Sequence, residues 1–109
     1  MDLIPVRIMG HVEKDNTVIL QVPKFSSKFF HRIFPRSQQM FYRIKLDKLG
    51  SVTWLKMNGD RNVQEIASII RQSDFMNKEE LLDLEIRLNK FMSQLYEQRY
   101  ITFKQLLQI

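Results

Sequence analysis

The 109-residue chain contains no cysteine, only three glycines and three prolines, and only short hydrophobic runs. The absence of cysteine excludes disulfides, thiolate metal sites and cysteine nucleophiles, and it fits a reducing compartment. None of the apolar runs, such as Val18-Ile19-Leu20, is long enough to cross a bilayer. The first five residues lack the basic and then apolar pattern of a signal peptide. We therefore expect a soluble, cytoplasmic protein.

Residues that carry catalysis or bind metals are also scarce. The only two histidines, His11 and His31, have no patterned carboxylate or second ligand beside them. The glycines are scattered, so the chain has no glycine-rich phosphate loop. Four acidic residues crowd positions 79–85 at the start of a predicted helix, where the helix dipole favours negative charge without a metal. We expect no cofactor, no metal site and no enzymatic activity of the chain alone.

Positive charge is concentrated in the first half of the chain. The formal net charge is +5. Residues 1–46 hold eight basic and three acidic residues, whereas residues 47–109 hold nine of each. Between Lys24 and Lys45 there are six basic residues and no acidic one. Such a stretch steers acidic partners, whether nucleic acid, anionic lipid or an acidic peptide. A solvated surface that keeps the protein soluble explains it equally well.

The first part of the chain is typical of β-strands. The runs at 6–9 and 17–22 flank a polar turn at 13–16, which predicts a hairpin. Pro23 ends the second strand because proline cannot donate to a β-ladder. A third strand is predicted at 42–46 from its strict alternation. This alternation would direct Tyr42, Ile44 and Leu46 to the core. Arg43 and Lys45 would face outward or line a groove.

A segment rich in phenylalanine and basic residues lies between these strands, at about 24–40. Apolar residues at 25, 29, 30, 33 and 34 have helical spacing, and Pro35 disfavours helix at the residue before it. We expect a short amphipathic helix whose phenylalanine face packs on the domain. The alternative is a basic surface helix for a membrane or a partner.

The second half of the chain changes to a helical period. Asp47 is a good N-cap for a helix that ends near Met57, and Gly59 suits the left-handed turn that follows. Asn62 caps a second helix, with Glu65 placed for a capping box. We expect Trp54, on the first of these helices, to lie in the core.

The third and longest helix is predicted from about Lys78 to Gln98, capped by Asn77. Spacings of three and four residues define one buried stripe, formed by Leu81, Leu84, Leu88, Phe91 and Leu95. Leu82, Ile86 and Met92 widen the apolar arc, which predicts contacts on more than one side of this helix. Residues 100–103 fit a terminal strand or an extended tail.

Three strands followed by three helices predict an α+β fold, with a three-stranded antiparallel sheet packed on a three-helix bundle in one domain over residues 1–109. The last two helices and the extended segment after them resemble a winged helix-turn-helix. However, the expected recognition helix carries leucines on nearly every side, and Arg87 and Lys90 are its only mid-helix basic residues. A nucleic-acid partner is therefore not favoured.

Two ordered motifs resemble the core signature of the PqqD family. Residues 46–54 read LDKLGSVTW, and residues 58–67 read NGDRNVQEIA. The family pattern has Leu-Asp, a glycine three positions later, a tryptophan four further on, and then Asp/Asn-Gly before a Thr/Asn-Val-x-Glu-Ile helix. The end of the last helix, from Phe91 to Ile101, also matches. The resemblance covers about residues 5–103 and is strongest over 44–70.

The chain departs from the family pattern in two places. Arg99 stands where the family usually has glycine, so we expect the last turn to close differently. The basic connection at about 24–40 is longer than in the shortest members.

The resemblance implies a function in recognising peptides. Members of the family bind the leader of a ribosomally made precursor peptide and present it to a modifying enzyme, often a radical SAM protein. The family fold is a three-stranded sheet beside three helices, and the leader adds a strand to the third β-strand, against the third helix. An adaptor subunit that binds another protein without a leader peptide remains the alternative, and the sequence does not set the oligomeric state.

Transferred to this chain, the resemblance implies a peptide-binding groove between a strand and a helix. The strand side would be Phe41, Tyr42, Arg43, Ile44 and Lys45, and the helix side would be Leu84, Arg87, Leu88 and Phe91. The two leucines and Phe91 would form apolar walls, and the three basic residues would attract acidic residues of the guest. For each leucine taken singly, a plain core position is the simpler interpretation.

Overall fold

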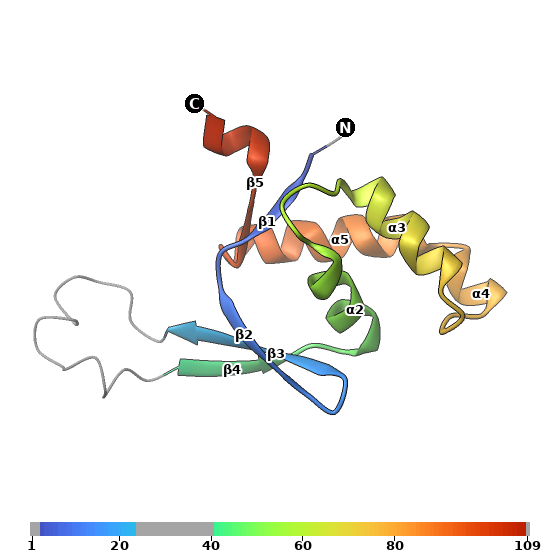
Figure 1. The fold of residues 1–109 in the computed structure, drawn as a ribbon, viewed down its shortest axis with the longest axis horizontal. Helices are drawn as coiled ribbons and strands as arrows, with labels where there is room; N and C mark the ends of the chain where they lie inside the picture. Colours follow the sequence, from blue (N-terminus) through green and yellow to red (C-terminus); the bar gives the residue numbers. More distant parts are fainter. Residues whose placement is uncertain (1–2, 24–40, 109) are drawn as a thin grey trace, which may run out of the picture.

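The computed structural model describes residues 3–23 and 41–108, and the helix expected within 24–40 lies outside them. The fold is α+β, as predicted, and the described residues form four α-helices, a three-stranded antiparallel sheet and a second sheet of two strands (Figure 1). The strands are β1 (Pro5–Arg7), β2 (Gly10–Lys14), β3 (Thr17–Pro23), β4 (Phe41–Lys45) and β5 (Ile101–Phe103). The helices are α2 (Lys48–Lys56), α3 (Val63–Gln72), α4 (Lys78–Leu81) and α5 (Leu84–Glu97), followed by the 3-10 helix η2 (Lys104–Gln108).

The predicted hairpin is present, but its first strand and its turn were placed wrongly. The turn has only two residues, Asp15 and Asn16, with positive φ angles of 52° and 64°. This is the type I′ geometry that joins adjacent antiparallel strands most tightly. It allows Lys14 to pair with Thr17, so β2 runs over 10–14 instead of 6–9.

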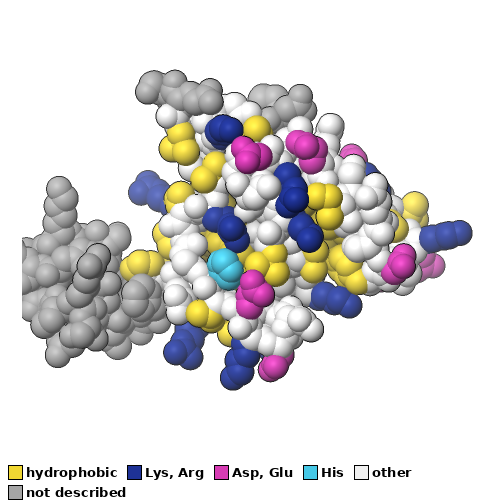
Figure 2. All heavy atoms as spheres, in the orientation of Figure 1, with side chains coloured by type: hydrophobic (Ala, Val, Ile, Leu, Met, Phe, Trp, Pro, Cys, Tyr) yellow, Lys and Arg dark blue, Asp and Glu magenta, His cyan; other side chains and the backbone are white. Residues whose placement is uncertain are grey.

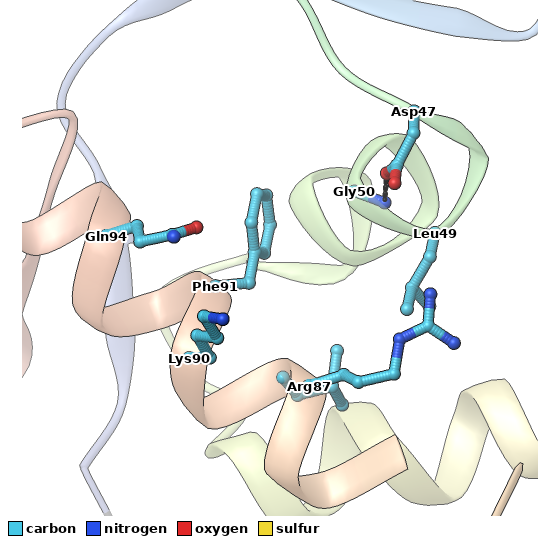
Figure 3. Close-up of a pocket in the computed structure, with 8 residues that line it drawn as sticks. Asp47, Leu49, Gly50, Arg87, Lys90, Phe91 and Gln94 are labelled. Carbon is cyan, nitrogen blue, oxygen red and sulfur yellow. Dashed lines mark hydrogen bonds between the residues drawn. The ribbon is translucent and has the colours of Figure 1, made fainter. Parts of the chain in front are cut away.

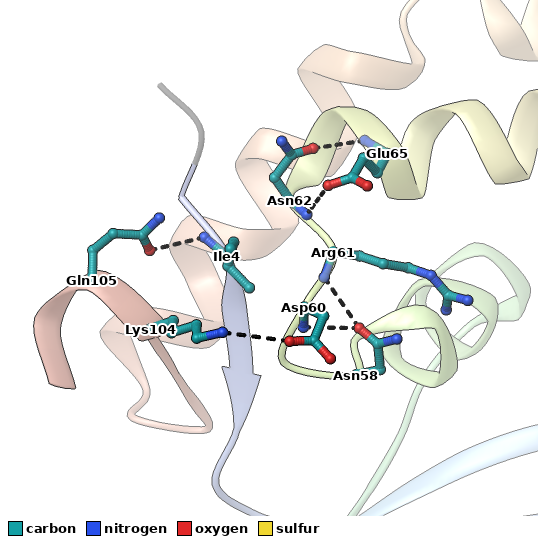
Figure 4. A network of polar contacts seen from close by, with 8 residues as sticks. All are labelled: Ile4, Asn58, Asp60, Arg61, Asn62, Glu65, Lys104 and Gln105. Atoms are coloured by element: carbon teal, nitrogen blue, oxygen red, sulfur yellow. Dashed lines mark hydrogen bonds and ion pairs between the residues drawn. The ribbon is translucent and has the colours of Figure 1, made fainter. Parts of the chain in front are cut away.

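The segment expected to form that first strand pairs instead with the end of the chain. β1 and β5 are antiparallel, and Val6 lies opposite Thr102. Backbone hydrogen bonds from Ile8 to Tyr100 and from Lys104 to Ile4 extend this pairing at both ends. In Figure 4, the Gln105 side chain adds to it by accepting from the Ile4 amide, while Lys104 pairs with Asp60 in the turn before α3. The two ends of the chain are therefore held together.

The helices begin at the predicted N-caps. The Asp47 carboxylate accepts a hydrogen bond of 2.7 Å from the Gly50 amide. Asn62 and Glu65 form a complete capping box, which is drawn in Figure 4. Asn77 forms a second one with Glu80. These side chains satisfy amide groups that the first turn of a helix leaves without partners.

The predicted third helix is divided in two. α4 ends at Leu81, and α5 begins at Leu84 after Asp83, whose φ of −113° and ψ of 21° are not helical. Aspartate forms helix interiors poorly and favours helix starts, but the side chain of Asp83 makes no capping bond. Leu82, at the break, is 86% exposed, and Ile86 is 72% exposed. The prediction of contacts on more than one side of this helix was therefore wrong at Leu82 and Ile86.

The last turn of α5 closes through Arg99 in the left-handed conformation, with φ of 64°. The amide of Tyr100 bonds to the carbonyl of Leu95, and the amide of Arg99 bonds to that of Tyr96. These two bonds define a Schellman motif. The turn therefore has the closure that glycine favours, although we expected a different one from the arginine.

The hydrophobic core lies between one face of the three-stranded sheet and the helices. β3 contributes Val18 and Leu20, and α2 contributes Trp54, all with no exposed surface. Trp54 is thus a core residue, as predicted. The helical side of the core comprises Ile66, Ala67 and Ile70 of α3 and Leu84, Leu88, Met92 and Leu95 of α5. In Figure 1, α2 lies over the end of the sheet at which β4 finishes.

Candidate functional site

β4 is an edge strand of the three-stranded sheet. The strand order is β2-β3-β4, and β4 pairs with no strand but β3 in the part of the chain that the structure describes. The amide of Leu46 donates to the carbonyl of Val18, so the backbone groups of Leu46 point toward β3. Because this direction alternates along an antiparallel strand, those of Ile44 also point toward β3, and those of Arg43 and Lys45 point to the open edge. An edge of this kind can accept a further strand.

The side chains of β4 alternate between the two faces of the sheet. Lys45 lies opposite Ile19 and Arg43 lies opposite Gln21, on the face turned away from the core, which we call the outer face. Both basic side chains are exposed, as predicted. Ile44 lies opposite Leu20 on the core side and is half-buried. Leu46 is 9% exposed, in agreement with its predicted place in the core.

Tyr42 does not reach the core. It lies on the core side of β4, opposite Val22, but its side chain remains 55% exposed. The reason is visible in Figure 1, where the helices cover the other end of the sheet and the start of β4 extends beyond them. The prediction that Tyr42 is a core residue was therefore wrong.

A pocket of about 290 Å³ begins where β4 ends. It lies between the first turn of α2 and the middle of α5 (Figure 3). In Figure 3 the Phe91 ring rises from α5 toward α2, and Arg87 extends along the opposite side of the pocket toward Leu49. The lining residues are Asp47, Leu49 and Gly50 from α2 and its cap, and Arg87, Leu88, Lys90, Phe91 and Gln94 from α5.

The packing of the Phe91 ring of α5 against the first turn of α2 depends on Gly50. A Cβ atom at this position would lie 2.8 Å from Oδ1 of Asp47 and 3.4 Å from the edge of the Phe91 ring. The missing side chain therefore allows the ring to pack against the capped first turn. It also leaves the open space of the pocket beside it.

Ser51 fixes the start of α2 against the end of the sheet. Its hydroxyl accepts from the Val18 amide at 2.9 Å and donates to the Leu46 carbonyl at 3.3 Å. The hydroxyl thus bridges the Val18 amide and the Leu46 carbonyl just past the end of β4, and Ser51 is only 1% exposed. Because hydrogen-bonded buried polar groups have little freedom, this contact holds the pocket in place beside the edge strand.

The structure brings together three of the four predicted helix residues. Arg87, Leu88 and Phe91 line the pocket, whereas Leu84 is fully buried in the core and does not line it. Leu88 is also fully buried and forms part of the pocket floor. The strand residues at 41–45 lie along the neighbouring edge and do not line the pocket itself. The side chain of Phe41 lies outside the described part of the structure.

Sequence reasoning missed two polar residues of the pocket and the side formed by α2. Lys90 and Gln94 line it from α5, one turn and two turns after Arg87. Lys90 lies three residues after Arg87, and Gln94 lies four residues after Lys90. This helical spacing could have identified both as neighbours of Arg87. For α2, the signal was Gly50 inside a helix, since a helical glycine points to a close approach.

The exposed charges near the pocket and the edge are mainly positive. Arg43, Lys45, Arg87 and Lys90 are all exposed, and none forms an ion pair with another residue of the described ranges. Elsewhere, Arg71 pairs with Glu85 at 3.1 Å. Figure 2 shows basic and apolar side chains spread over the visible face, and not gathered into one patch. Asp47 lies among them as an acidic residue of the pocket lining, but it forms no ion pair with them. Positive groups that form no ion pair attract acidic ligands.

Two kinds of feature are absent from the described residues. Within residues 3–23 and 41–108, no three histidine or acidic side chains lie close enough together to hold a metal ion. In the same ranges, no helix has the length and apolar character needed to cross a membrane.

Comparison with other proteins adds no relative to this description. No family model matches the chain, and no curated protein and no solved structure matches it either.

Proposed function

We propose that this chain is a non-catalytic peptide-binding module. It binds the leader segment of a ribosomally made precursor peptide as an added strand on β4 and presents it to a modifying enzyme. A radical SAM enzyme is the first candidate for that partner. The observation that carries this proposal is the open edge of β4 beside the pocket between α2 and α5. The resemblance of residues 46–67 to the PqqD signature supports it.

Strand addition explains how a flexible peptide gains affinity here. Arg43 and Lys45 each turn one amide and one carbonyl to the edge, and each backbone hydrogen bond contributes about 1 kcal/mol net. Four such bonds give only weak binding after the peptide has lost its conformational freedom. Side-chain contacts must supply the remainder. The pocket next to the edge offers apolar surface from Leu49 and Phe91, which makes it the place for an anchoring side chain of the guest.

A titration followed by amide chemical shifts tests this function. The ¹⁵N-labelled chain is titrated with synthetic peptides covering the first half of each short open reading frame encoded beside its gene. We expect one peptide to shift the amides of residues 41–46 and 87–94 in a saturable manner. The control is a scrambled peptide of the same composition, which should leave these amides unchanged.

Two results would contradict the proposal. If every peptide leaves residues 41–46 unperturbed while the intact neighbouring enzyme binds, the chain is an adaptor that needs no leader. If a peptide binds but shifts only amides remote from β4 and α5, such as those of β1 and β5, then strand addition at β4 is wrong.

A further inference from the structure

We infer that the guest of the β4 edge is a strand in which acidic and apolar residues alternate, with two acidic side chains at positions i and i+2 beside Arg43 and Lys45. This inference rests on the proposed function, and it specifies the chemistry of the peptide that this edge selects.

The first step is the direction of the guest side chains. Residues that lie directly opposite each other in neighbouring strands point to the same face of the sheet. Arg43 and Lys45 point to the outer face, since Gln21 and Ile19 are their partners on β3. A guest residue opposite Arg43 therefore also points to the outer face, and so does the guest residue opposite Lys45. These two guest residues are separated by one other residue, which points to the core side.

The second step is the charge of the outer face. The strand register places nine described side-chain positions on it, of which three are basic and none is acidic. These are Gly10, Val12, Lys14, Thr17, Ile19, Gln21, Pro23, Arg43 and Lys45. The neighbours of Arg43 and Lys45 on β3 are uncharged, so no carboxylate across the strand neutralises them. A guest carboxylate opposite each would complete a cross-strand ion pair.

The third step is the apolar character of the core side. Ile44 is half-buried there and packs against the hydrophobic core. Beyond the end of β4, the chain continues past Leu46 to the pocket, where Leu49 and Phe91 offer apolar surface. The rest of its lining includes four polar side chains, those of Asp47, Arg87, Lys90 and Gln94. Guest side chains on this side meet apolar surface and gain by being apolar. A basic outer face, together with apolar contacts at Ile44, Leu49 and Phe91 on the other side, thus favours a period of two in the guest.

The test uses three designed probes of one length. Each is a capped nine-residue peptide in which valine alternates with glutamate, with glutamine or with lysine. Dissociation constants are measured by calorimetry at low and at high salt, and binding at β4 is checked by the amide shifts of residues 41–46. Because opposite charges across a strand contribute up to roughly 1 kcal/mol per pair, two pairs should make the glutamate peptide bind about tenfold tighter than the glutamine peptide at low salt.

Variants of the protein identify the responsible residues. In R43Q/K45Q the preference for glutamate should disappear, and in R43E/K45E it should change to a preference for the lysine peptide. The matched control is Lys14→Gln, which removes a basic residue from the same outer face but on the far strand β2. It should keep the tenfold preference.

The outcomes separate this inference from the proposed function. If the glutamate and glutamine peptides bind β4 with equal affinity, or if the preference persists in R43Q/K45Q, the inference is wrong while strand addition stands. If none of the three peptides shifts residues 41–46, while a natural leader does, the alternating pattern is wrong. If no peptide of any kind shifts them, the proposed function fails and the inference fails with it.

Discussion

At the scale of single residues, Gly50 joins the stability of the fold to the shape of the pocket. A glycine inside a helix normally costs about 0.5–1 kcal/mol relative to alanine. Here we expect Gly50→Ala to lower the free energy of unfolding by about 1–2 kcal/mol, because the new methyl group would displace the Asp47 cap and press on Phe91. Urea denaturation measures this change.

Gly10 provides the matched control for that substitution. A Cβ atom at Gly10 would meet only the Gln21 side chain, at an ordinary contact distance of 3.7 Å. Gly10→Ala should therefore be neutral or slightly stabilising, because alanine loses less conformational freedom on folding. Equal losses of stability in the two variants would show that crowding between α2 and α5 is not the cause.

Arg99 leads to a prediction of the opposite sign. A side chain at φ of 64° is strained by its Cβ atom, and this strain costs roughly 1 kcal/mol. We expect Arg99→Gly to raise the free energy of unfolding by about 1 kcal/mol. Arg99→Ala removes the same charge but keeps the Cβ atom, so it should give no such gain. Thermal and urea denaturation of both variants distinguish relief of strain from loss of charge.

At the scale of elements, α5 has one face in the core and one face exposed. Leu95 is 4% exposed and Ile86 is 72% exposed on the same helix. Leu95→Ala should therefore cost roughly 2–5 kcal/mol of stability, as truncation of a buried leucine does. Ile86→Ala should change stability by less than about 0.5 kcal/mol. A large loss in Ile86→Ala would mean that this residue is covered in solution.

Local signals predicted the start of each element better than its interruptions. The N-caps Asp47, Asn62 and Asn77 were all found from the sequence, because a capping side chain acts within three residues of itself. The break after Leu81 was not found, because the apolar spacing continues across it without a glycine or proline. The pairing of β1 with β5 was also missed, since strands that are nearly a hundred residues apart leave no local mark on each other.

The candidate site was predictable to the extent that it follows the alternation of one strand. The outward direction of Arg43 and Lys45 and the half-buried place of Ile44 followed from the period of two. Tyr42 fits the same pattern, but its exposure depends on where the helices end. The periodicity of a strand gives no information about that position. In the same way, Leu84 and Leu88 belong to one stripe, and their spacing does not reveal that Leu88 lines the pocket and Leu84 does not.

At the scale of the whole molecule, the paired ends of the chain close the fold. A chain ending at Tyr100 would lose β5 and with it the buried side chain of Ile101, which is 1% exposed. We expect this truncation to cost more than about 3 kcal/mol. A chain ending at Phe103 keeps β5 and loses only η2, in which Leu106 and Leu107 are exposed. It should retain most of the stability, as measured by the midpoint of urea denaturation. Equal losses of stability in the two truncated chains would show that η2, and not β5, holds the ends of the fold together.

The positive charges at the sheet edge also bear on how two copies of this protein meet. If β4 of one copy approached β4 of another in antiparallel fashion, Arg43 of each would come close to Lys45 of the other. Like charges facing each other across strands are repulsive, and lysine on edge strands is a common natural guard against aggregation. The open strand therefore carries its own protection against fibre-like stacking, and that protection should weaken as rising ionic strength screens the charges.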